Sequence, residues 1–444
     1  MTNRTKIGKL KEKTGQEVTL AGWVDTRRDH GKLIFIDLRD ASDKVQMVVL
    51  PNHENAHPIA QKLRPEWVIK VVGLVNKRPE KMINAEQTNG DLEIEVKEIE
   101  ILSEAKELPF DKDSELNLDT YLDYLPLTLR TKRGSSIFKV QATILEAYRE
   151  SLRRQGFTEF EAPVLVGGDA EGGSAAFTVD YFYDQKAFLA TSPQFYKQIM
   201  VGVFERSFTT AKVFRAEKSA TTRHLSEITQ MDFEMGFIKN HLEPMAVLEQ
   251  AVKDAVEAVA GKHSDILKEF GTEKPLLPEH FPILTLLEAQ EILEKEFDVK
   301  AVGEPDMEPE HERLICEWAK KNKESDFVFI THFPTEKRAF YTYAEPENSK
   351  LSRSFDLLFR GLEINSGSQR IHDYDELVEK IKSRGMDPEK FKFYLQAFKY
   401  GMPPHAGSST GLERFTARML EIPNVKEATL FPRDLNRIDS LLSQ

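Results

Sequence analysis

The residues best suited to do chemistry lie in one segment near the middle of the chain, residues 211–236. Its two flanks alternate apolar and polar residues as antiparallel strands do, and a short polar turn joins them. Four side chains would meet at the mouth of this hairpin: Arg215, Glu217, Arg223 and His224. Because a guanidinium group matches phosphate oxygens in a bidentate way, the arrangement suits a triphosphate. The alternative is a solvated hairpin tip with surface ion pairs.

The segment resembles motif 2 of class II aminoacyl-tRNA synthetases, in the aspartyl, asparaginyl and lysyl subgroup. The resemblance is carried by FRAE, a short loop, RHLSE and the acidic strand DFEM. It implies an ATP site in which Arg215 is a catalytic residue. Glu217, Arg223 and His224 would border the nucleotide.

A second implied catalytic residue is Arg414. The sequence GMPPHAGSSTGLERF, which follows a predicted helix over 387–400, resembles motif 3 of the family, a glycine-rich strand that enters a helix. Arg414 matches the arginine over the adenine and γ-phosphate. The family has a denser glycine pattern, and Ser409 and Thr410 would narrow the nucleotide floor, since glycine is used where a ligand approaches the backbone closely. A synthetase-shaped, nucleic-acid-binding protein without catalysis is therefore an alternative.

The resemblance further implies a divalent-cation site at two carboxylates, for which ordinary charges at a sheet edge are the alternative. Asp356 and Glu363 lie in SFDLLFRGLEINSGSQR, which is predicted to be one extended segment. A regular strand would place them on opposite faces, so a bulge near residues 360–361, or binding at different depths, would be needed to bring them together. In the family, residues matching Asp356, Glu363 and Ser366 hold magnesium on the ATP phosphates, and this hard cation prefers oxygen ligands.

The resemblance also implies a pocket for an amino acid. SPQFYKQ, residues 192–198, resembles the SPQxxKQ segment of aspartyl-tRNA synthetases. Lys197 and Arg370 match two cations that clamp the aspartate side chain, and a carboxylate in a partly dehydrated pocket needs fixed positive charge. Gln194 and Glu171 match residues that orient the substrate. Asparaginyl enzymes have SGQxxxE here, so Lys197 favours aspartate, with asparagine as the alternative.

Glu171 lies in a glycine-rich loop, residues 167–174, that lacks the GxxxxGK[ST] pattern, so we do not expect a phosphate loop there. The implied reaction joins aspartate to ATP as aspartyl-adenylate and then transfers it to the 3′ adenosine of a tRNA. No side-chain nucleophile is required. Catalysis would consist of positioning and of charge neutralisation by Arg215, Arg414 and Mg²⁺.

These residues need a scaffold of several elements, and the first is a small barrel over residues 1–105. Strands are predicted at 18–24, 33–37, 45–50, 67–75 and 92–101, with a short helix at 56–63. A helix after the third of five strands is typical of an OB-fold, which often binds single-stranded nucleic acid. Within it, GWVDTRRDHGKLIFIDLRD resembles the anticodon-binding domain of bacterial aspartyl-tRNA synthetases.

That resemblance implies contacts between the barrel and the anticodon of tRNA-Asp. Phe35 would stack on a base and Gln46 would read the edge of the next, while Arg28 belongs to the basic first turn. Phe35 as a residue of the barrel core is the alternative. His30 matches a histidine typical of enzymes that also charge tRNA-Asn, whereas Lys81 matches a lysine typical of strict ones. We give His30 the greater weight.

A polar, proline-punctuated hinge is predicted at 106–131, followed by a catalytic domain over 132–444. The family implies an α+β domain, an antiparallel sheet flanked by helices. A helix at 135–154, then Gly156 and a strand at 157–165, resembles motif 1, which builds a homodimer interface around the residue matching Pro163. Helices at 243–259, 285–296 and 309–322 and a strand at 327–331 follow, and the next segment, HFPTEKRAFYTY, offers little chemistry. The spacing of the motifs resembles archaeal and eukaryotic enzymes.

The composition sets outer bounds on the class of protein. The chain has 444 residues, a net charge of −12 and one cysteine, Cys316, which excludes an intramolecular disulfide and fits a reducing compartment. No Cys/His cluster has zinc spacing, and no apolar run or signal peptide indicates a membrane or secreted protein, so we expect a cytoplasmic one. The acidic total argues mildly against nucleic-acid binding, which needs only a local basic face.

Overall fold

The computed structural model describes residues 4–85, 87–111, 114–168, 175–218 and 221–438. It divides the chain into two compact units, Met1–Ser114 and Glu115–Gln444. The stretch 106–131 is shared between them, because α2 (Leu118–Asp123) and α3 (Leu125–Thr128) belong to the second unit. None of the described helices is long and apolar enough to cross a membrane.

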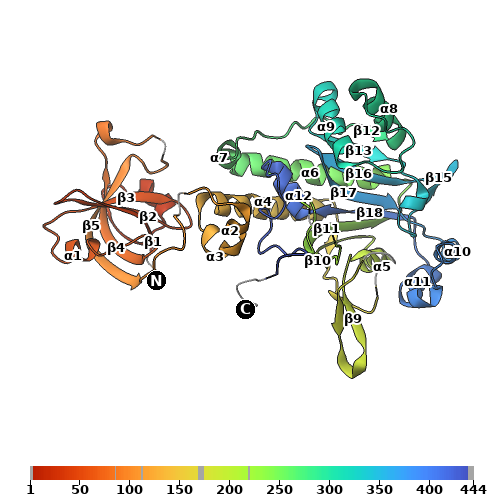
Figure 1. The fold of residues 1–444 in the computed structure, drawn as a ribbon, viewed down its shortest axis with the longest axis horizontal. Helices are drawn as coiled ribbons and strands as arrows, with labels where there is room; N and C mark the ends of the chain where they lie inside the picture. Colours follow the sequence, from red (N-terminus) through yellow and green to blue (C-terminus); the bar gives the residue numbers. More distant parts are fainter. Residues whose placement is uncertain (1–3, 86, 112–113, 169–174, 219–220, 439–444) are drawn as a thin grey trace. The chain divides into compact units, whose positions relative to one another are not determined.

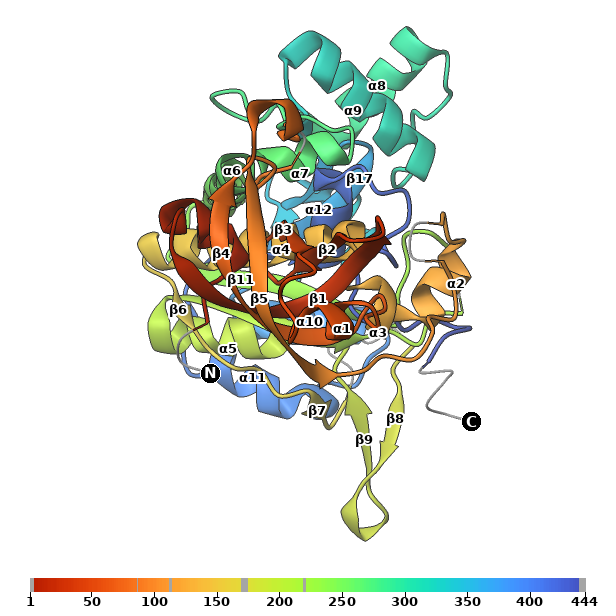
Figure 2. The ribbon, with the colours of Figure 1, turned by 90° about the vertical axis from the view of Figure 1, so that its left-hand side faces the viewer.

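The first unit is a closed five-stranded barrel with strand order β1-β2-β3-β5-β4 (Figures 1 and 2). Its elements are η1 (Ile7–Lys13), β1 (Glu17–Asp29), β2 (Ile34–Arg39), β3 (Lys44–Val49), α1 (His57–Ala60), β4 (Val68–Lys77), η2 (Glu80–Met82) and β5 (Leu92–Ser103). The helix follows the third strand, so the predicted OB-fold is confirmed. In β2, Ile34 and Ile36 are fully buried in the core while Phe35 lies half-buried on the other face, as the period-two alternation of a strand requires.

The second unit is built on an eight-stranded sheet of order β12-β13-β16-β17-β18-β11-β10-β6. The strands are β6 (Thr158–Glu159), β10 (Arg206–Phe214), β11 (Glu227–Gly236), β12 (Ile283–Thr285), β13 (Phe327–Thr331), β16 (Ser354–Phe359), β17 (Leu362–Gln369) and β18 (His405–Gly411). Neighbours pair antiparallel except β12 with β13 and β6 with β10. The predicted antiparallel sheet flanked by helices is therefore confirmed.

Helices cover one face of this sheet and form the largest hydrophobic core (Figure 1). They are α4 (Lys132–Arg154), α6 (Leu242–Lys262), α7 (Ser264–Glu269) and α12 (Leu412–Met419). Along β11 the residues Met231, Phe233 and Met235 belong to that core. The intervening Asp232 and Glu234 are also buried, and they lie on the opposite face, where the candidate site is built.

Two smaller groups of helices complete the unit. One combines α8 (Leu286–Phe297) and α9 (Pro309–Lys323) with β13 around a separate apolar cluster. The other combines α5 (Gln194–Phe204), α10 (Tyr374–Ser383), η5 (Pro388–Phe391) and α11 (Lys392–Lys399). The remaining short elements are η3 (Phe182–Asp184), η4 (Thr335–Lys337), β14 (Ala344–Glu345) and β15 (Asn348–Ser352).

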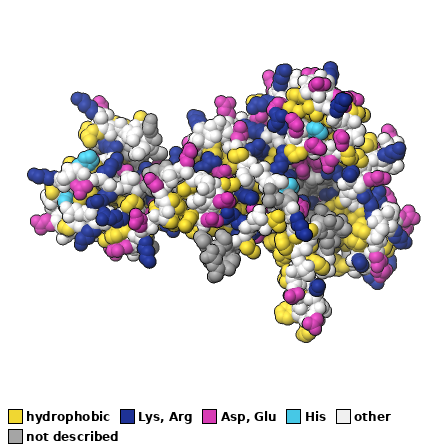
Figure 3. Space-filling view, in the orientation of Figure 1, with side chains coloured by type: hydrophobic (Ala, Val, Ile, Leu, Met, Phe, Trp, Pro, Cys, Tyr) yellow, Lys and Arg dark blue, Asp and Glu magenta, His cyan; other side chains and the backbone are white. Residues whose placement is uncertain are grey.

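The predicted continuous strand at 157–165 is wrong. Only β6 joins the large sheet, and β7 (Leu165–Val166) belongs to a separate three-stranded sheet with β8 (Thr178–Asp180) and β9 (Lys186–Leu189). Pro163 lies in the irregular stretch between them, and a proline has no N–H to donate to a ladder. The β8–β9 hairpin projects from the unit and carries exposed aromatic side chains (Figures 1 and 3).

Candidate active site

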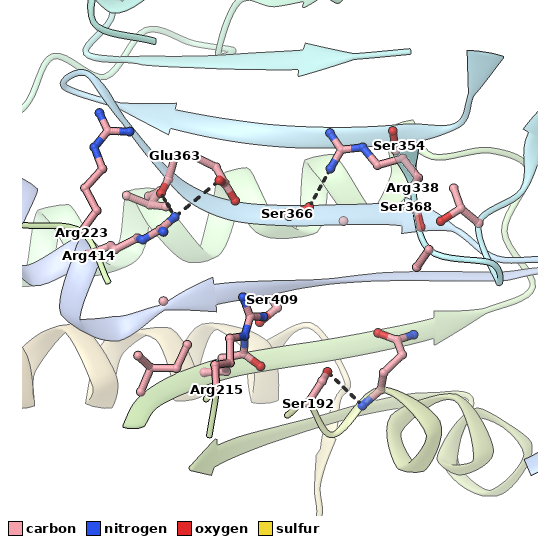
Figure 4. Close-up of a pocket in the computed structure, with 18 of the residues that line it drawn as sticks. Ser192, Arg215, Arg223, Arg338, Ser354, Glu363, Ser366, Ser368, Ser409 and Arg414 are labelled. Carbon is pink, nitrogen blue, oxygen red and sulfur yellow. Dashed lines mark hydrogen bonds and ion pairs between the residues drawn. The ribbon is translucent and has the colours of Figure 1, made fainter. Parts of the chain in front are cut away.

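A polar cavity of about 360 Å³ lies over the open face of the large sheet (Figure 4). Ten of the twelve residues that the sequence assigned to the ATP, amino-acid and cation sites line it: Gln194, Lys197, Arg215, Glu217, Arg223, His224, Glu363, Ser366, Arg370 and Arg414. The eleventh, Asp356, contacts the lining residue Arg338. Glu171 lies outside the described residues. Segments that are up to 220 residues apart, from Gln194 to Arg414, thus share one cavity.

Arg414 and Arg215 both line the cavity, and their guanidinium groups differ in whether the described part of the protein supplies a hydrogen-bond acceptor. Nη1 of Arg414 donates to the carbonyl of Glu363 at 2.9 Å and lies 3.4 Å from its carboxylate Oε2. Arg215 follows β10, and its backbone N–H donates to the carbonyl of Ser226, which holds the two sides of the hairpin together. Nε of Arg215 is buried without a hydrogen-bond partner among the described residues. Such a donor is costly to bury unless a ligand satisfies it.

The hairpin mouth also holds His224 beside Glu217. Nδ1 of His224 lies 2.7 Å from the hydroxyl of Thr221, and its Nε2 lies 4.0 Å from Glu217. Burial lowers the pKa of His224, and Arg414, Arg223 and Arg215 lower it further against the opposing charge of Glu217. The imidazole is therefore neutral at pH 7, and the positive charge of this end comes from arginine.

The carboxylate segment is a hairpin, so the single extended strand predicted over it is wrong. Arg360 and Gly361 turn the chain between β16 and β17, with φ of 45° and 81°, the left-handed region that a tight turn uses. Asp356 then pairs directly with Ser366 across the two strands, and a bulge lies between Leu357 and Leu358. A turn and a bulge together bring the predicted cation ligands to one place.

Arg338 is a cavity residue to which sequence reasoning assigned no role. Its Nη2 donates to Oδ2 of Asp356 at 2.6 Å, and its Nη1 lies 3.4 Å from the hydroxyl of Ser366 (Figure 4). Oδ1 of Asp356 stays buried without a hydrogen-bond partner among the described residues. Burial raises the pKa of Glu363, opposed by Arg414, and Asp356 raises it further. The only signal in the sequence was a basic pair, Lys337 and Arg338, six and seven residues after the end of the predicted strand at 327–331.

The opposite end of the cavity is a buried charge network. The Lys197 side chain is 1% exposed, and its Nζ lies 3.0 Å from Oδ2 of Asp232 and 3.6 Å from Oε2 of Glu234. Arg370 donates to both oxygens of Glu234, to the carbonyl of Gly407 at 3.0 Å and to the hydroxyl of Ser368 at 2.6 Å. Burial by itself would raise the pKa of Glu234, but Arg370 and Lys197 outweigh it and the pKa is lowered.

A chain of neutral hydrogen bonds supports this end from behind. The amide oxygen of Gln198 accepts from Nε2 of Gln194 at 2.9 Å and from the hydroxyl of Tyr394 at 3.1 Å. Its Nε2 then donates to Nε2 of His405 at 2.8 Å, while Nδ1 of His405 donates to the carbonyl of Pro403. Burial lowers the pKa of His405 to about 4. The orientation of Gln194 in the cavity thus depends on a neutral histidine.

The departures from the glycine pattern of motif 3 divide between the two faces of β18. Ser409 lines the cavity, and its hydroxyl donates to Oδ1 of Asp232 at 2.6 Å. Thr410 is fully buried and contacts Tyr148 of α4 and Asn365 instead. The expectation that both side chains would narrow the nucleotide floor is therefore wrong for Thr410, because consecutive residues of a strand face opposite ways.

In the barrel, four of the five predicted anticodon residues lie on or next to β1, β2 and β3. The rings of His30 and Phe35 make an edge-to-face contact, with centroids 5.6 Å apart. Nη2 of Arg28 donates to Asp37 and, at 3.2 Å, to Oε1 of Gln46. Phe35 is half-buried and its neighbours fill the core, so its assignment to the barrel core is wrong. Lys81 is exposed on η2, in the connection between β4 and β5.

Comparison with known proteins shows the family to which both units belong. Residues 117–435 match the family model of class II tRNA synthetases (D, K and N), and residues 18–102 match the OB-fold nucleic acid binding domain. The chain is 44% identical to the aspartate–tRNA(Asp/Asn) ligase of Thermus thermophilus over 98% of its length and 99% of the relative. It is 39% identical to the aspartate–tRNA(Asp) ligase of Pyrococcus furiosus, over 96% and 97%.

A solved structure is similar over both units. The asparaginyl-tRNA synthetase of Pyrococcus horikoshii complexed with asparaginyl-adenylate superposes with a TM-score of 0.90 at 32% identity, covering 99% of this chain and all of that one. The family model spans most of the chain, and the relatives span nearly all of it. The chain therefore belongs to the class II tRNA synthetases of the D, K and N group and, within them, to the aspartate–tRNA ligases.

Proposed function

We propose that this cavity activates L-aspartate with ATP and transfers the aspartyl group to tRNA. The observation that carries the proposal is the division of one cavity into two ends. Lys197 and Arg370 are buried at one end, and Arg215 and Arg414 present guanidinium groups at the other. The first end suits a small carboxylate and the second a triphosphate, since arginine pairs with phosphate in a bidentate way.

Charge favours aspartate over asparagine as the substrate. Arg370 has five N–H donors, and one on Nη1 remains beyond its bonds to Glu234, Ser368 and Gly407. A β-carboxylate can accept from that donor and lies in the field of Lys197. A neutral amide would bring no charge to the two cations. Gln194 would orient the substrate, and Glu171 would meet its α-amino group.

The first step is attack of the aspartate α-carboxylate on the α-phosphorus of ATP, with pyrophosphate leaving. The buried Nε of Arg215, which has no protein acceptor among the described residues, would bind a phosphate oxygen. Arg414, held by the carbonyl of Glu363, would lie along the nucleotide. Glu217, Arg223 and His224 would border it. The contribution of these residues is position and charge, with no covalent intermediate on the protein.

Asp356, Glu363 and Ser366 fit a hard divalent cation such as Mg²⁺. Oδ1 of Asp356 is buried with no hydrogen-bond partner in the described part of the chain, and Ser366 pairs with Asp356 across the strands. Burial and the neighbouring carboxylate of Asp356 raise the pKa of Glu363, opposed by Arg414. Bound there, Mg²⁺ would neutralise charge on the ATP phosphates. The described residues hold no cluster of three His, Cys, Asp or Glu side chains with metal-binding geometry, so the ATP phosphates would supply further oxygens.

We infer that the barrel reads the anticodon with Phe35, His30, Arg28 and Gln46, and that both tRNA-Asp and tRNA-Asn are charged. The edge-to-face contact leaves Phe35 half-exposed as a stacking surface. His30 can donate or accept a hydrogen bond, and so can tolerate either third base, whereas Lys81 would meet phosphate. The name of the Thermus relative includes both tRNAs. The enzyme would act as a homodimer in the cytoplasm.

The test is ATP–pyrophosphate exchange with aspartate and with asparagine in parallel, followed by aminoacylation of both transcripts. We expect exchange with aspartate alone, and aspartylation of both tRNAs. Exchange with asparagine would overturn the substrate, and no exchange with either would favour a non-catalytic protein. A preference for tRNA-Asp beyond about a hundredfold, roughly 2.7 kcal/mol, would show that the enzyme is strict.

A further inference from the structure

We call the end of the cavity with Arg215 and Arg414 the nucleotide end, and the end with Lys197 and Arg370 the amino-acid end. Helix α9 lies outside the strands that build the cavity, yet one of its acidic residues contacts two segments of the nucleotide end. Glu312 sits in the first turns of α9 and is buried. The helix packs through Leu314, Ile315 and Ala319 in an apolar cluster with β13. These apolar contacts are enough to explain why α9 packs on β13, so the buried carboxylate of Glu312 is not needed for that packing. Burying a carboxylate is unfavourable unless it is paired, so its partners indicate what it does.

The carboxylate of Glu312 joins two segments that are far apart in the sequence. Its Oε1 and Oε2 accept from Nη1 of Arg223 at 3.2 and 3.0 Å. Oε2 also accepts from the backbone N–H of Glu363 at 3.0 Å. Nη2 of Arg223 in turn donates to the carbonyl of Gly361, in the turn between β16 and β17. The mouth of the β10–β11 hairpin is thereby tied to the start of β17.

The peptide units around Glu363 are also where Arg414 is held, since Nη1 of Arg414 donates to the carbonyl of Glu363. Arg223 is therefore positioned through Glu312, which also accepts from the backbone N–H of Glu363. Arg414 is positioned directly, by its bond to the carbonyl of Glu363. Figure 4 shows Arg223 and Arg414 on the same side of Glu363 at this end of the cavity. Among the described residues, no other acidic side chain makes an ion pair with Arg223.

We infer that Glu312 is a positioning residue for the nucleotide site, which sets Arg223 in register with Arg414 through the backbone of Glu363. The inference rests on the proposed ATP site and adds a residue from a helix that does not line it. Loss of the carboxylate frees Arg223 from α9 and leaves the N–H of Glu363 without its acceptor. Among the described residues, no hydrogen bond or ion pair links Glu312 to Lys197 or Arg370, so we expect the amino-acid end to keep its geometry.

The experiment compares Glu312→Gln and Glu312→Ala with Glu317→Gln in the full chain. Glu317 is on the same helix and pairs with Arg313 at 2.6 Å on the exposed face, so it is a matched control. In pyrophosphate exchange we expect Glu312→Ala to raise the KM for ATP about tenfold or more, as loss of a charge-assisted contact does. The KM for aspartate should stay within about twofold, a change below 0.5 kcal/mol. Glu312→Gln, which can still accept from the Glu363 N–H, should lie between.

The outcomes separate the two proposals. An unchanged KM for ATP in both Glu312 variants overturns the positioning role, as does a common fall in kcat with both KM values fixed, because that reports only a smaller folded fraction. If Glu312→Ala does not fold, the folded Glu312→Gln variant decides by the same criterion. Absence of aspartate-dependent exchange in the wild-type protein would instead overturn the proposed function. A change in Glu317→Gln equal to that in Glu312→Gln would also count against the role.

Discussion

Arg370 holds Glu234 with two prongs of its guanidinium group, Nε to Oε1 at 2.9 Å and Nη2 to Oε2 at 3.3 Å. Both side chains are buried, and Lys197 shares the same carboxylate at 3.6 Å. The two cations proposed to bind the substrate are thus already positioned by the carboxylates of β11 in the absence of a ligand. Fixed dipoles and charges of this kind cost no reorganisation when the substrate binds.

Arg370→Lys should keep the positive charge beside Glu234 but lose the two parallel hydrogen bonds of the guanidinium group to its carboxylate. We expect kcat/KM for aspartate to fall by a factor that corresponds to about 2–3 kcal/mol of lost transition-state stabilisation, because lysine cannot replace a bidentate guanidinium. The protein should stay folded. Arg370→Ala should in addition lower the free energy of unfolding by about 3–5 kcal/mol, since it leaves a buried carboxylate without its partner. Pyrophosphate exchange and chemical denaturation measure the two effects. Wild-type aspartate activation by Arg370→Lys would contradict the assignment.

Ser409 and Thr410 are consecutive and should behave differently. Ser409→Ala removes the 2.6 Å bond to Asp232, which also pairs with Lys197, so we expect the KM for aspartate to rise about tenfold. Thr410→Val removes the hydroxyl that contacts Tyr148 and accepts from Asn365, which keeps its bond to Ser408, and should lower the free energy of unfolding by about 1–3 kcal/mol. Its KM for ATP should equal that of the wild type. Impaired ATP binding by Thr410→Val would show instead that the Thr410 side chain affects the nucleotide site.

The stability of the catalytic unit should depend on pH through His405. Its pKa is about 4 in the fold, below the value near 6.5 of an unfolded histidine, so the unfolded state binds the extra proton first. The contribution is fully present above about pH 6.5 and is lost as the pH falls towards 4; it amounts to about 3 kcal/mol. His405→Gln should show a shallower fall in the free energy of unfolding between these values. Identical pH profiles would contradict it.

The tRNA preference should depend on the first barrel turn. We expect His30→Leu to lower aspartylation of tRNA-Asn by about tenfold, or 1.4 kcal/mol, relative to tRNA-Asp, because leucine offers no hydrogen bond to either base. Lys81→Ala should weaken both tRNAs alike, as a phosphate contact would. Steady-state aminoacylation of the two transcripts measures the ratio. A ratio unchanged by His30→Leu would show that discrimination lies elsewhere.

The homodimer predicted around Pro163 should depend on the apolar residues beside it. Leu165 is 51% exposed in the single chain and lies two residues after Pro163. Leu165→Asp should give a monomer by light scattering at micromolar concentration. Leu287→Asp is a matched control, since this leucine of α8 is 53% exposed and outside the predicted interface. A monomeric wild-type protein would contradict the dimer.

Local pattern was sufficient for most of the scaffold. Alternation over 18–101 predicts the barrel strands, and helical periodicity predicts α4, α6, α8 and α9 within a few residues. These signals are reliable because the face of a strand or helix that packs against the core must be apolar, and the spacing of its apolar residues can be read from one continuous segment. Motif resemblance predicted Arg215 and Arg414 as catalytic residues, and both line the cavity.

Contacts between distant segments were decided by the tertiary structure alone. A turn at residues 360–361 was needed to bring Asp356 to Ser366, and β16 could not be separated from β17 in an apolar, alternating run. The sequence assigned no role to Arg338 or to Glu312, and only the structure shows that they pair with Asp356 and Arg223. An ion pair depends on the spatial path of two segments, so its partners leave no mark in the neighbouring sequence. Which face of β18 a side chain takes likewise depends on the register with β11 and β17.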